Sequence, residues 1–341
     1  MKLVSYDTGA GPRAGVIAGE RIVDVTALLG SPATVRDVRD LLEQPLAPLE
    51  RLSRALAAGQ AAPSVPLAGT RLRAPVLQPP TVRDFMIFEE HATAQGTRQQ
   101  EDAWYRMPIF YFSNPLRIFG PEDEVPYPTA SVRLDYELEL GCVIGREGSN
   151  VPEAEGQSYI AGFTIFNDWS ARDLQMDEMA VRLGPAKGKD CATSLGPCVV
   201  TADEMAPYLE DGRLNVTCTV KVNGDYWLEE GNGGQGAHAH HSWGSLVERA
   251  SRDSRIVPGD VFGTGTVGGG SIGEAMRKGY AKARFLEPGD VVEIEVEGIG
   301  VLRNTIGPNV DPDPSYRYKA ASLPPLPDVG SAKDYRYRRK P

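Results

Sequence analysis

Leu134-Asp135-Tyr136-Glu137-Leu138-Glu139 is the stretch of sequence on which the interpretation of the fold depends. In an extended strand, side chains alternate between two faces, so Glu137 and Glu139 point to the same side. Their carboxylates are about 7 Å apart along the strand and resist burial unless a cation lies between them. Asp168 closes a second apolar run, residues 160–166, and a strand ending there would deliver a third carboxylate. Three oxygen donors without thiolate or imidazole favour Mg²⁺, Mn²⁺ or Ca²⁺ over zinc.

The motifs around these carboxylates argue against the alternative, in which Glu137 and Glu139 line the solvated face of an amphipathic strand. They occur along the chain as Asp84-Phe85 with His91-Ala92-Thr93, then D-x-E-x-E, then N-D-W-S-A-R-D-L-Q (167–175), then Leu183-Gly184-Pro185 with Gly188-Lys189, then Gly263-Thr264-Gly265-Thr266. This order resembles the fumarylacetoacetate hydrolase family over roughly residues 79–307, and the N-D-W-S-A-R-D-L-Q run is highly specific. The resemblance implies that Glu137, Glu139 and Asp168 bind a divalent metal, with Asp84 added as in fumarylacetoacetase.

Further site residues are implied by the same resemblance. His91 lies seven positions after Asp84, and a histidine can take a proton from water when a carboxylate orients its other ring nitrogen. The family supplies that carboxylate from a position after the G-T motif, which in this chain is Glu274. Lys189 matches a lysine that lies beside the metal and stabilises an oxyanion. The family's substrate-binding positions correspond to Tyr111, Arg172, Gln175 and Thr266.

Several of these residues also have purely structural interpretations. His91 can be a satisfied structural histidine, and Glu274 can be a surface glutamate. Arg172 can form a salt bridge with Asp173 or Glu178 instead of binding a substrate.

The resemblance implies a divalent-metal-dependent hydrolase that cleaves a C–C bond in a 1,3-diketo acid of the fumarylacetoacetate or acylpyruvate type. The reaction would pass through a metal-bound enolate, with water activated by His91 and Glu274, and aromatic catabolism is the expected setting. Alternatives within the family are a 2-oxo acid decarboxylase, a 2-hydroxyhepta-2,4-diene-1,7-dioate isomerase and a 2-oxo-4-enoate hydratase. A non-catalytic metal-binding or ligand-sensing module is an alternative of another class. Met179 stands where fumarylacetoacetase-like sequences carry a substrate-binding tyrosine, which leaves the substrate open.

The composition is that of an ordinary soluble globular protein. A net charge of −10 over 341 residues argues against nucleic acid and anionic membrane surfaces as partners. The first residues contain no apolar signal region, and no apolar run approaches the length of a membrane span, so a cytoplasmic location is expected. The four cysteines form no C-x-x-C pair and are too sparse for a disulfide framework.

The pattern of elements predicts a mainly β fold with some α-helix (α+β). Residues 1–78 are expected to form a small N-terminal β domain with short helices and a proline-rich linker. Residues 79–320 would form the catalytic domain, which the family resemblance describes as a mixed β-roll, and residues 321–341 a C-terminal arm. The resemblance also implies a homodimer, and exposed strand edges that need covering support it.

Local signals predict individual elements. Thr34 and Asp37 resemble a capping box, and Pro45 and Pro48 should divide the helical pattern that follows into two short helices. Residues 292–296 alternate apolar and acidic side chains and should form a hairpin with residues 299–302.

Two further motifs are set aside. Residues 263–268 fit G-x-G-x-x-G, but the glycine-rich residues 269–273 cannot open the long helix of a dinucleotide site. A backbone loop lining the active site is the better interpretation. His238, His240 and His241 suggest a transition-metal cluster, but their glycine-rich surroundings favour a mobile loop with adventitious metal affinity.

Overall fold

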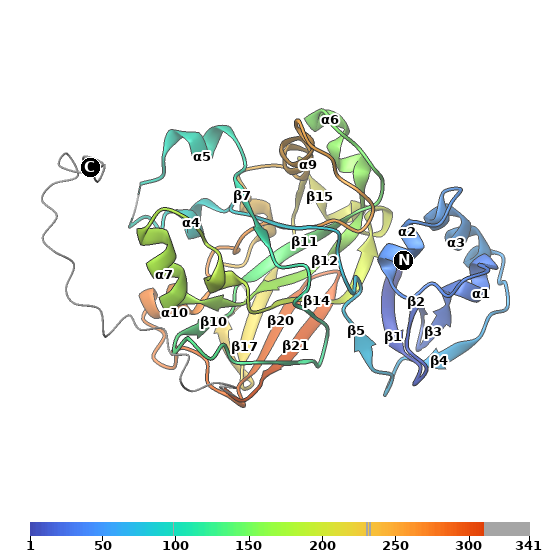
Figure 1. Cartoon of the computed structure of the whole chain (residues 1–341), viewed down its shortest axis with the longest axis horizontal. Coiled ribbons are helices and arrows are strands. Elements are labelled where there is room, and N and C mark those ends of the chain that lie inside the picture. The colour runs from blue at the N-terminus through green and yellow to red at the C-terminus, as the bar shows by residue number, and fades with distance from the viewer. Residues whose placement is uncertain (98, 230, 232, 310–341) are drawn as a thin grey trace, which may run out of the picture. The chain divides into compact units, whose positions relative to one another are not determined.

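A large, mostly antiparallel β-sheet is the central element of the computed structural model, which describes residues 1–97, 99–229, 231 and 233–309 (Figure 1). In these residues the sheet has twelve strands, ten of which follow one another in the order β4-β3-β2-β1-β14-β12-β11-β19-β6-β7. Their bounds in that order are Ser64–Pro66, Arg21–Asp24, Pro12–Ala18, Lys2–Asp7, Thr193–Thr201, Ile160–Asp168, Leu138–Ile144, Val261–Gly263, Val82–Phe85 and Phe110–Ser113. β5 (Leu72–Arg73) pairs with β1, and β8 (Ile118–Phe119) pairs with β14.

A second sheet and two small ribbons complete the β structure of the described residues. The second sheet has the order β18-β17-β20-β21-β9, with bounds Asp225–Leu228, Cys218–Val222, Val291–Val296, Gly300–Ile306 and Glu124–Val125. The ribbons are β10 (Leu134–Asp135) with β13 (Ser170–Ala171), and β15 (Leu209–Glu210) with β16 (Arg213–Leu214). The expected hairpin is therefore confirmed as β20 and β21.

The helices are short. The α-helices α1 to α10 are Val25–Leu29, Val38–Leu42, Pro48–Ala57, Glu89–Ala92, Asp102–Arg106, Glu153–Gly156, Arg172–Ala180, Ala202–Met205, Trp243–Ser251 and Ile272–Arg277. The 3₁₀ turns η1 to η4 are Gln157–Tyr159, Lys187–Lys189, Ala206–Tyr208 and Gly236–His238. None of the helices in the described residues has the length and apolar character needed to cross a membrane. The predicted fold class, mainly β with some α, is confirmed.

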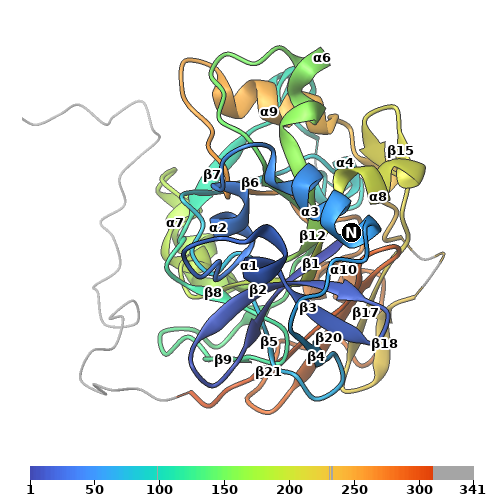
Figure 2. The same ribbon diagram turned by 90° about the vertical axis from the view of Figure 1, so that its right-hand side faces the viewer.

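The N-terminal residues fold largely as their local signals predict, and they face the viewer in Figure 2. Two short helices, α2 and α3, lie on either side of Pro45, and α3 begins at Pro48. The capping box was wrong in register: Asp37, not Thr34, caps α2. The reason is that the Asp37 carboxylate accepts hydrogen bonds from the amide of Asp40 and from that of Leu77 in the proline-rich segment.

One sheet runs from the N-terminal residues into the site-bearing strands. β1 pairs with β2 on one side and with β14 on the other, with Leu3 opposite Val199. The proline-rich stretch before residue 79 contributes β4 and β5 to the same sheet. Residues Met1–Asn309 form one compact unit, and the boundary predicted after residue 78 falls within it. The arm expected at residues 321–341, and the end of the catalytic domain at residue 320, lie outside the described residues.

Candidate metal centre and active site

Neighbouring strands of the large sheet bring four carboxylates together. Asp84 is on β6, Glu139 is on β11, Asp168 ends β12, and Glu137 lies between β10 and β11. Each offers one oxygen to a group in which all four lie within 4.8 Å of one another, and all four side chains are buried. The strands β12, β11, β19 and β6 are consecutive in the sheet, so residues far apart in the sequence meet on one face. The structure thus places the predicted metal ligands together.

Two cations compensate part of this charge. The ammonium of Lys189 contacts Glu137 and lies 2.5 Å from Oδ2 of Asp168, and it also donates to Oγ of Ser170 at 2.7 Å. The guanidinium of Arg172 lies 2.7 Å from Oε1 of Glu137. Arg172 also pairs with the buried Asp135, so the buried carboxylates of this region outnumber the two cations that contact them.

Burial and the neighbouring charges shift the pKa values of these carboxylates away from their ordinary values. Burial raises the pKa of Asp168 to about 7, despite the opposing effect of Lys189. Burial and the neighbouring Asp84 raise the pKa of Glu139 well above its ordinary value. Burial also acts to raise the pKa of Glu137, but Arg172 and Lys189 outweigh it, so this pKa is lowered.

Two buried oxygens of the group are free to bind a cation. Within the described residues, Oε1 of Glu139 and Oδ1 of Asp168 have no hydrogen-bond partner. Buried polar atoms are rarely left in this state, because the loss of hydration is costly. Together with the all-oxygen donor set, this fits Mg²⁺, Mn²⁺ or Ca²⁺.

The glycine-rich motif lines this site, as its interpretation as a backbone loop predicted. The amide of Gly265 donates to Oε2 of Glu139 at 2.9 Å and to Oδ1 of Asp84 at 3.1 Å. A Cβ atom at Gly263 would lie 2.6 Å from Oε2 of Glu139, so the backbone can approach the carboxylates only without a side chain. The helix that follows, α10, starts only at Ile272 and has six residues, which is too short for a dinucleotide site.

His91 and Glu274 form a hydrogen-bonded pair next to the carboxylates. Nδ1 of His91 lies 3.2 Å from Oε2 of Glu274, which also accepts a hydrogen bond from Oγ of Ser271 at 2.9 Å. Burial opposes ionisation of Glu274, but the hydrogen bond with His91 outweighs it, so the pKa of Glu274 is lowered. An ionised carboxylate only accepts hydrogen bonds, so Nδ1 carries the proton and Nε2 is left as a base. Nε2 of His91 lies 3.8 Å from Oε1 of Glu137. Glu274 is buried, so the alternative interpretation as a surface glutamate was wrong.

Arg172 is held by a residue that the sequence analysis missed. Its Nε donates to Oδ2 of Asp135 at 2.8 Å, and its NH1 donates to Oε1 of Gln175 at 3.0 Å. The alternative salt bridge to Asp173 or Glu178 was wrong. Asp173 instead accepts hydrogen bonds from Ser131 and the amide of Val132.

Glu178 ties the turn that carries Lys189 to helix α7. Its carboxylate accepts hydrogen bonds from the amides of Ala186, Lys187 and Gly188, at 2.9, 2.6 and 3.1 Å. Since Glu178 belongs to the same helix as Arg172, the two cationic side chains of the centre are mounted on one connected segment.

A cavity of about 240 Å³ opens onto the carboxylates. Its walls include the predicted residues Tyr111, Gln175, Lys189 and Thr266, whereas the predicted Arg172 contacts Glu137 without lining the cavity. Met179 also lines the cavity. The hydroxyl of Tyr111 donates to Asp168, and Oγ1 of Thr266 is buried without a partner in the described residues. Thr266 can therefore offer its hydroxyl to a substrate oxygen.

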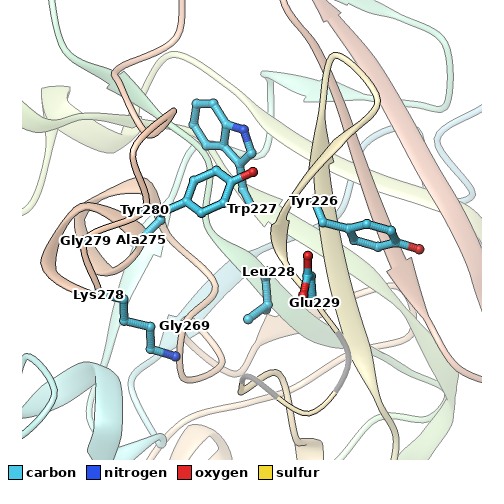
Figure 3. Close-up of a pocket in the computed structure, with 9 residues that line it drawn as sticks. All are labelled: Tyr226, Trp227, Leu228, Glu229, Gly269, Ala275, Lys278, Gly279 and Tyr280. Atoms are coloured by element: carbon cyan, nitrogen blue, oxygen red, sulfur yellow. The ribbon is translucent and has the colours of Figure 1, made fainter.

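A larger cavity of about 410 Å³ does not contain the predicted chemistry. Figure 3 shows its aromatic walls, with Tyr226 and Trp227 from β18 and Tyr280 from the segment after α10. It includes none of the predicted metal ligands or catalytic residues. We therefore take the smaller cavity as the active site.

Each of the three clustered histidines contacts a different residue. Nε2 of His241 lies 2.8 Å from the carbonyl oxygen of Trp104, and that of His240 lies 3.1 Å from the carbonyl of Tyr105. His238 lies near Glu90 at 3.6 Å. In the part of the chain that the structure describes, the carboxylate group is the only set of residues arranged to hold a metal ion.

Known proteins are similar to this chain over most of its length. A family model described as fumarylacetoacetate (FAA) hydrolase C-terminal matches residues 81–307, which include all the predicted site residues. The chain belongs to the fumarylacetoacetate hydrolase family. A human member of the family, named oxaloacetate tautomerase FAHD2A, mitochondrial, is 31% identical over 311 residues, covering 90% of this chain and 91% of the relative.

Solved structures of other proteins show the same fold. The 5-carboxymethyl-2-hydroxymuconate delta-isomerase from Mycobacterium smegmatis has a TM-score of 0.63 and 27% identity, covering 90% of this chain and 99% of that chain. A fumarylacetoacetate hydrolase from psychrophilic Exiguobacterium antarcticum has a TM-score of 0.69 with the same coverages, and at 24% identity this likeness shows the fold alone. The proteins to which this chain is similar are thus named for different reactions.

Proposed function

We propose that this member of the family is a divalent-metal-dependent hydrolase that cleaves a C–C bond in a 1,3-diketo acid. The observation that supports the proposal is the position of His91, whose Nδ1 lies 3.2 Å from Glu274 while its Nε2 lies 3.8 Å from Glu137. A base oriented by a carboxylate is thereby directed towards the group that would hold the metal.

Different residues of the chain perform different parts of the proposed reaction. Asp84, Glu137, Glu139 and Asp168 would hold Mg²⁺, Mn²⁺ or Ca²⁺, which when bound supplies Lewis-acid polarisation of the substrate's oxo-acid oxygens. Nε2 of His91 takes a proton from water, and the resulting hydroxide adds to the distal carbonyl of the substrate.

The bond between that carbon and the adjacent methylene then breaks. One product is a carboxylic acid, and the other is the enolate of a 2-oxo acid, which is protonated at carbon. The ammonium of Lys189 lies at the carboxylates and stabilises this negative charge as it develops. Tyr111, Arg172, Gln175 and Thr266 position the substrate's oxygens.

Keto–enol tautomerisation of an oxaloacetate-like acid is the second candidate. The likeness to the human protein named oxaloacetate tautomerase favours it. The same base can move a proton between carbon and oxygen without adding water to a carbonyl. The two reactions therefore differ in whether His91 activates water or abstracts a proton from the substrate.

An NMR experiment separates the two candidates. The protein is incubated with acetopyruvate and, separately, with oxaloacetate in the presence of Mg²⁺ or Mn²⁺. The proposal expects acetate and pyruvate from acetopyruvate. Faster enol–keto exchange of oxaloacetate, with acetopyruvate unchanged, would refute the hydrolase and support the tautomerase, whereas CO₂ release from oxaloacetate would indicate a decarboxylase.

The expected homodimer and cytoplasmic location also remain proposals, as does a role in aromatic catabolism. Light scattering at micromolar concentration tests the dimer, and a monomer would contradict it. Cell fractionation tests the location, which differs from the mitochondrial one in the names of the tautomerase relatives.

A further inference from the structure

The substrate cavity changes in character from its inner to its outer end. Its charged lining residues all belong to the carboxylate group or contact it: Asp84, His91, Glu137, Glu139 and Lys189. The remaining wall includes a set of apolar side chains: Met86, Ile109, Phe110, Met179 and Pro185. In the described part of the wall, the groups that can carry positive charge, Lys189 and His91, both lie at the inner end.

Strands β6 and β7 show how the sequence produces this change. They are antiparallel, with Asp84 opposite Tyr111 at the inner end. The last pair of the two strands is Phe85 with Phe110, and Met86 and Ile109 lie directly beyond it in the chain. All four of these apolar residues line the cavity.

Helix α7 shows the same change from charged to apolar side chains along its length. Arg172 contacts Glu137 at the inner end, and Gln175 and Met179 follow at three and seven positions, on the same helical face. A helix rises 1.5 Å per residue, so Met179 lies about 10 Å beyond Arg172 along the axis. Met179 is 54% exposed and Ile109 is 43% exposed, so the outer end is open enough to accept a chain.

We propose that the outer half of the cavity binds an uncharged, apolar acyl chain, and that Met86, Ile109 and Met179 select against substrates with a second, terminal carboxylate. The inference rests on the proposed function, because it takes the inner end as the site of the oxo-acid group. A terminal carboxylate against this wall would lose hydration without gaining a cation, which we expect to reduce kcat/KM by about tenfold.

A matched pair of substrates tests the inference on the unmodified protein. 2,4-Dioxoheptanoate and 2,4-dioxoheptanedioate differ only in a terminal methyl or carboxylate group. With Mg²⁺ or Mn²⁺, the methyl-ended compound should have the higher kcat/KM by about tenfold. An equal or higher value for the dicarboxylate would overturn the inference while leaving the hydrolase proposal intact.

A binding measurement separates failure of the inference from failure of the proposed function. 2-Oxoheptanoate and 2-oxoheptanedioate lack the second carbonyl and cannot be hydrolysed, so their dissociation constants can be measured by calorimetry. Tighter binding of 2-oxoheptanoate without hydrolysis of either diketo acid would refute the hydrolase and support the apolar site. Equal binding of the two would refute the apolar site.

A variant that introduces a positive charge tests whether Met179 selects between the two kinds of substrate. Met179→Arg should raise the dicarboxylate-to-monocarboxylate ratio of kcat/KM by about fivefold, the upper range for a half-exposed ion pair. Met176→Arg is the matched control, because Met176 lies on the same helix and is 62% exposed but does not line the cavity. An unchanged ratio in Met179→Arg, or an equal change in Met176→Arg, would contradict the role of Met179.

Discussion

Asp135 accepts a hydrogen bond from Nε of Arg172 at 2.8 Å, and Arg172 in turn contacts Glu137 of the carboxylate group. The other carboxylate oxygen of Asp135 accepts a hydrogen bond from the amide of Ile272, also at 2.8 Å. Ile272 is the first residue of α10, the helix that carries Glu274. Asp135 therefore connects Arg172, which contacts Glu137, to the helix that carries the partner of His91.

Asp135→Asn should lower both stability and activity. The partly buried guanidinium of Arg172 loses a charged acceptor, which should cost about 1.5–3 kcal/mol in the free energy of unfolding, measured by urea denaturation. Displacement of Arg172 and α10 should lower kcat/KM by about 10- to 100-fold. Asp173→Asn is the control, since Asp173 is next to Arg172 in sequence but bonds to Ser131. Equal losses in both variants would contradict the connecting role.

His91→Ala should reduce kcat by about 10²- to 10⁴-fold, the usual contribution of a general base. Glu274→Gln should give a smaller loss, because the imidazole remains but its orienting charge is removed. Steady-state kinetics on an accepted diketo acid measure both effects. His238→Ala should retain full turnover, because His238 is exposed and lies outside the cavity. Full turnover in His91→Ala would rule out the proposed mechanism.

Divalent metal should stabilise the folded protein. At about a hundredfold excess over Kd, a cation that binds only the folded state adds about 2.7 kcal/mol, which corresponds to several degrees in Tm. Glu139→Gln should abolish the Tm increase on addition of Mg²⁺ or Mn²⁺, because Glu139 offers a buried oxygen without a partner in the described residues.

The control for the metal experiment is Asp177→Asn, which removes an exposed carboxylate from α7 and should retain the Tm increase. Absence of any shift with Mg²⁺, Mn²⁺ or Ca²⁺ in the unmodified protein would contradict the metal centre. Tightly bound stoichiometric zinc would instead direct attention to His238, His240 and His241.

The ion pair between Arg13 and Asp24 should make stability depend on pH. Burial acts to raise the pKa of Asp24, but its hydrogen bonds with Arg13 and the amide of Ala27 outweigh burial and lower the pKa. A lowered pKa in the folded state stabilises the protein above the unfolded value of about 3.9, and this stabilisation is lost as pH falls through the folded pKa.

Asp24→Asn tests this dependence, because asparagine can still cap helix α1. It should lower the free energy of unfolding by about 1–2 kcal/mol at neutral pH, with the difference from the unmodified protein shrinking below about pH 4. Urea denaturation at both pH values measures it. Asp225→Asn, in an exposed pair with Lys282, should cause no measurable change at either pH. A difference that grows on acidification would contradict the assigned sign.

Local geometry suggested three of the four carboxylates as candidate metal ligands, whereas Asp84 and the choice of a metal site over a solvated strand face came from the family resemblance. Strand alternation puts Glu137 and Glu139 on one face, and an apolar run of strand length puts Asp168 at its end. The same alternation applies to Asp135, so this signal was available for a residue that the sequence analysis left without a role. The contact of Asp135 with Arg172 could not be predicted in this way. It depends on the pairing of Asp135 with Ser170 across two short strands, which brings Arg172 close to Asp135.

Residues that meet only through the tertiary fold were beyond pattern reasoning. His91 and Glu274 are 183 positions apart, and both lie on short helices without periodicity that would relate them. Only the family resemblance suggested their pairing. The misplaced cap at Thr34 has a similar origin, because the contact of Asp37 with the amide of Leu77 is not visible in a local motif.

The hydrogen bonds of Glu178 have a consequence for how this active site can evolve. Because Glu178 joins helix α7 to the turn that bears Lys189, a shift of the helix to enlarge or reshape the cavity would also displace the ammonium from the carboxylates. New substrates are therefore more readily accommodated by exchanging the side chain at position 179 than by moving the backbone.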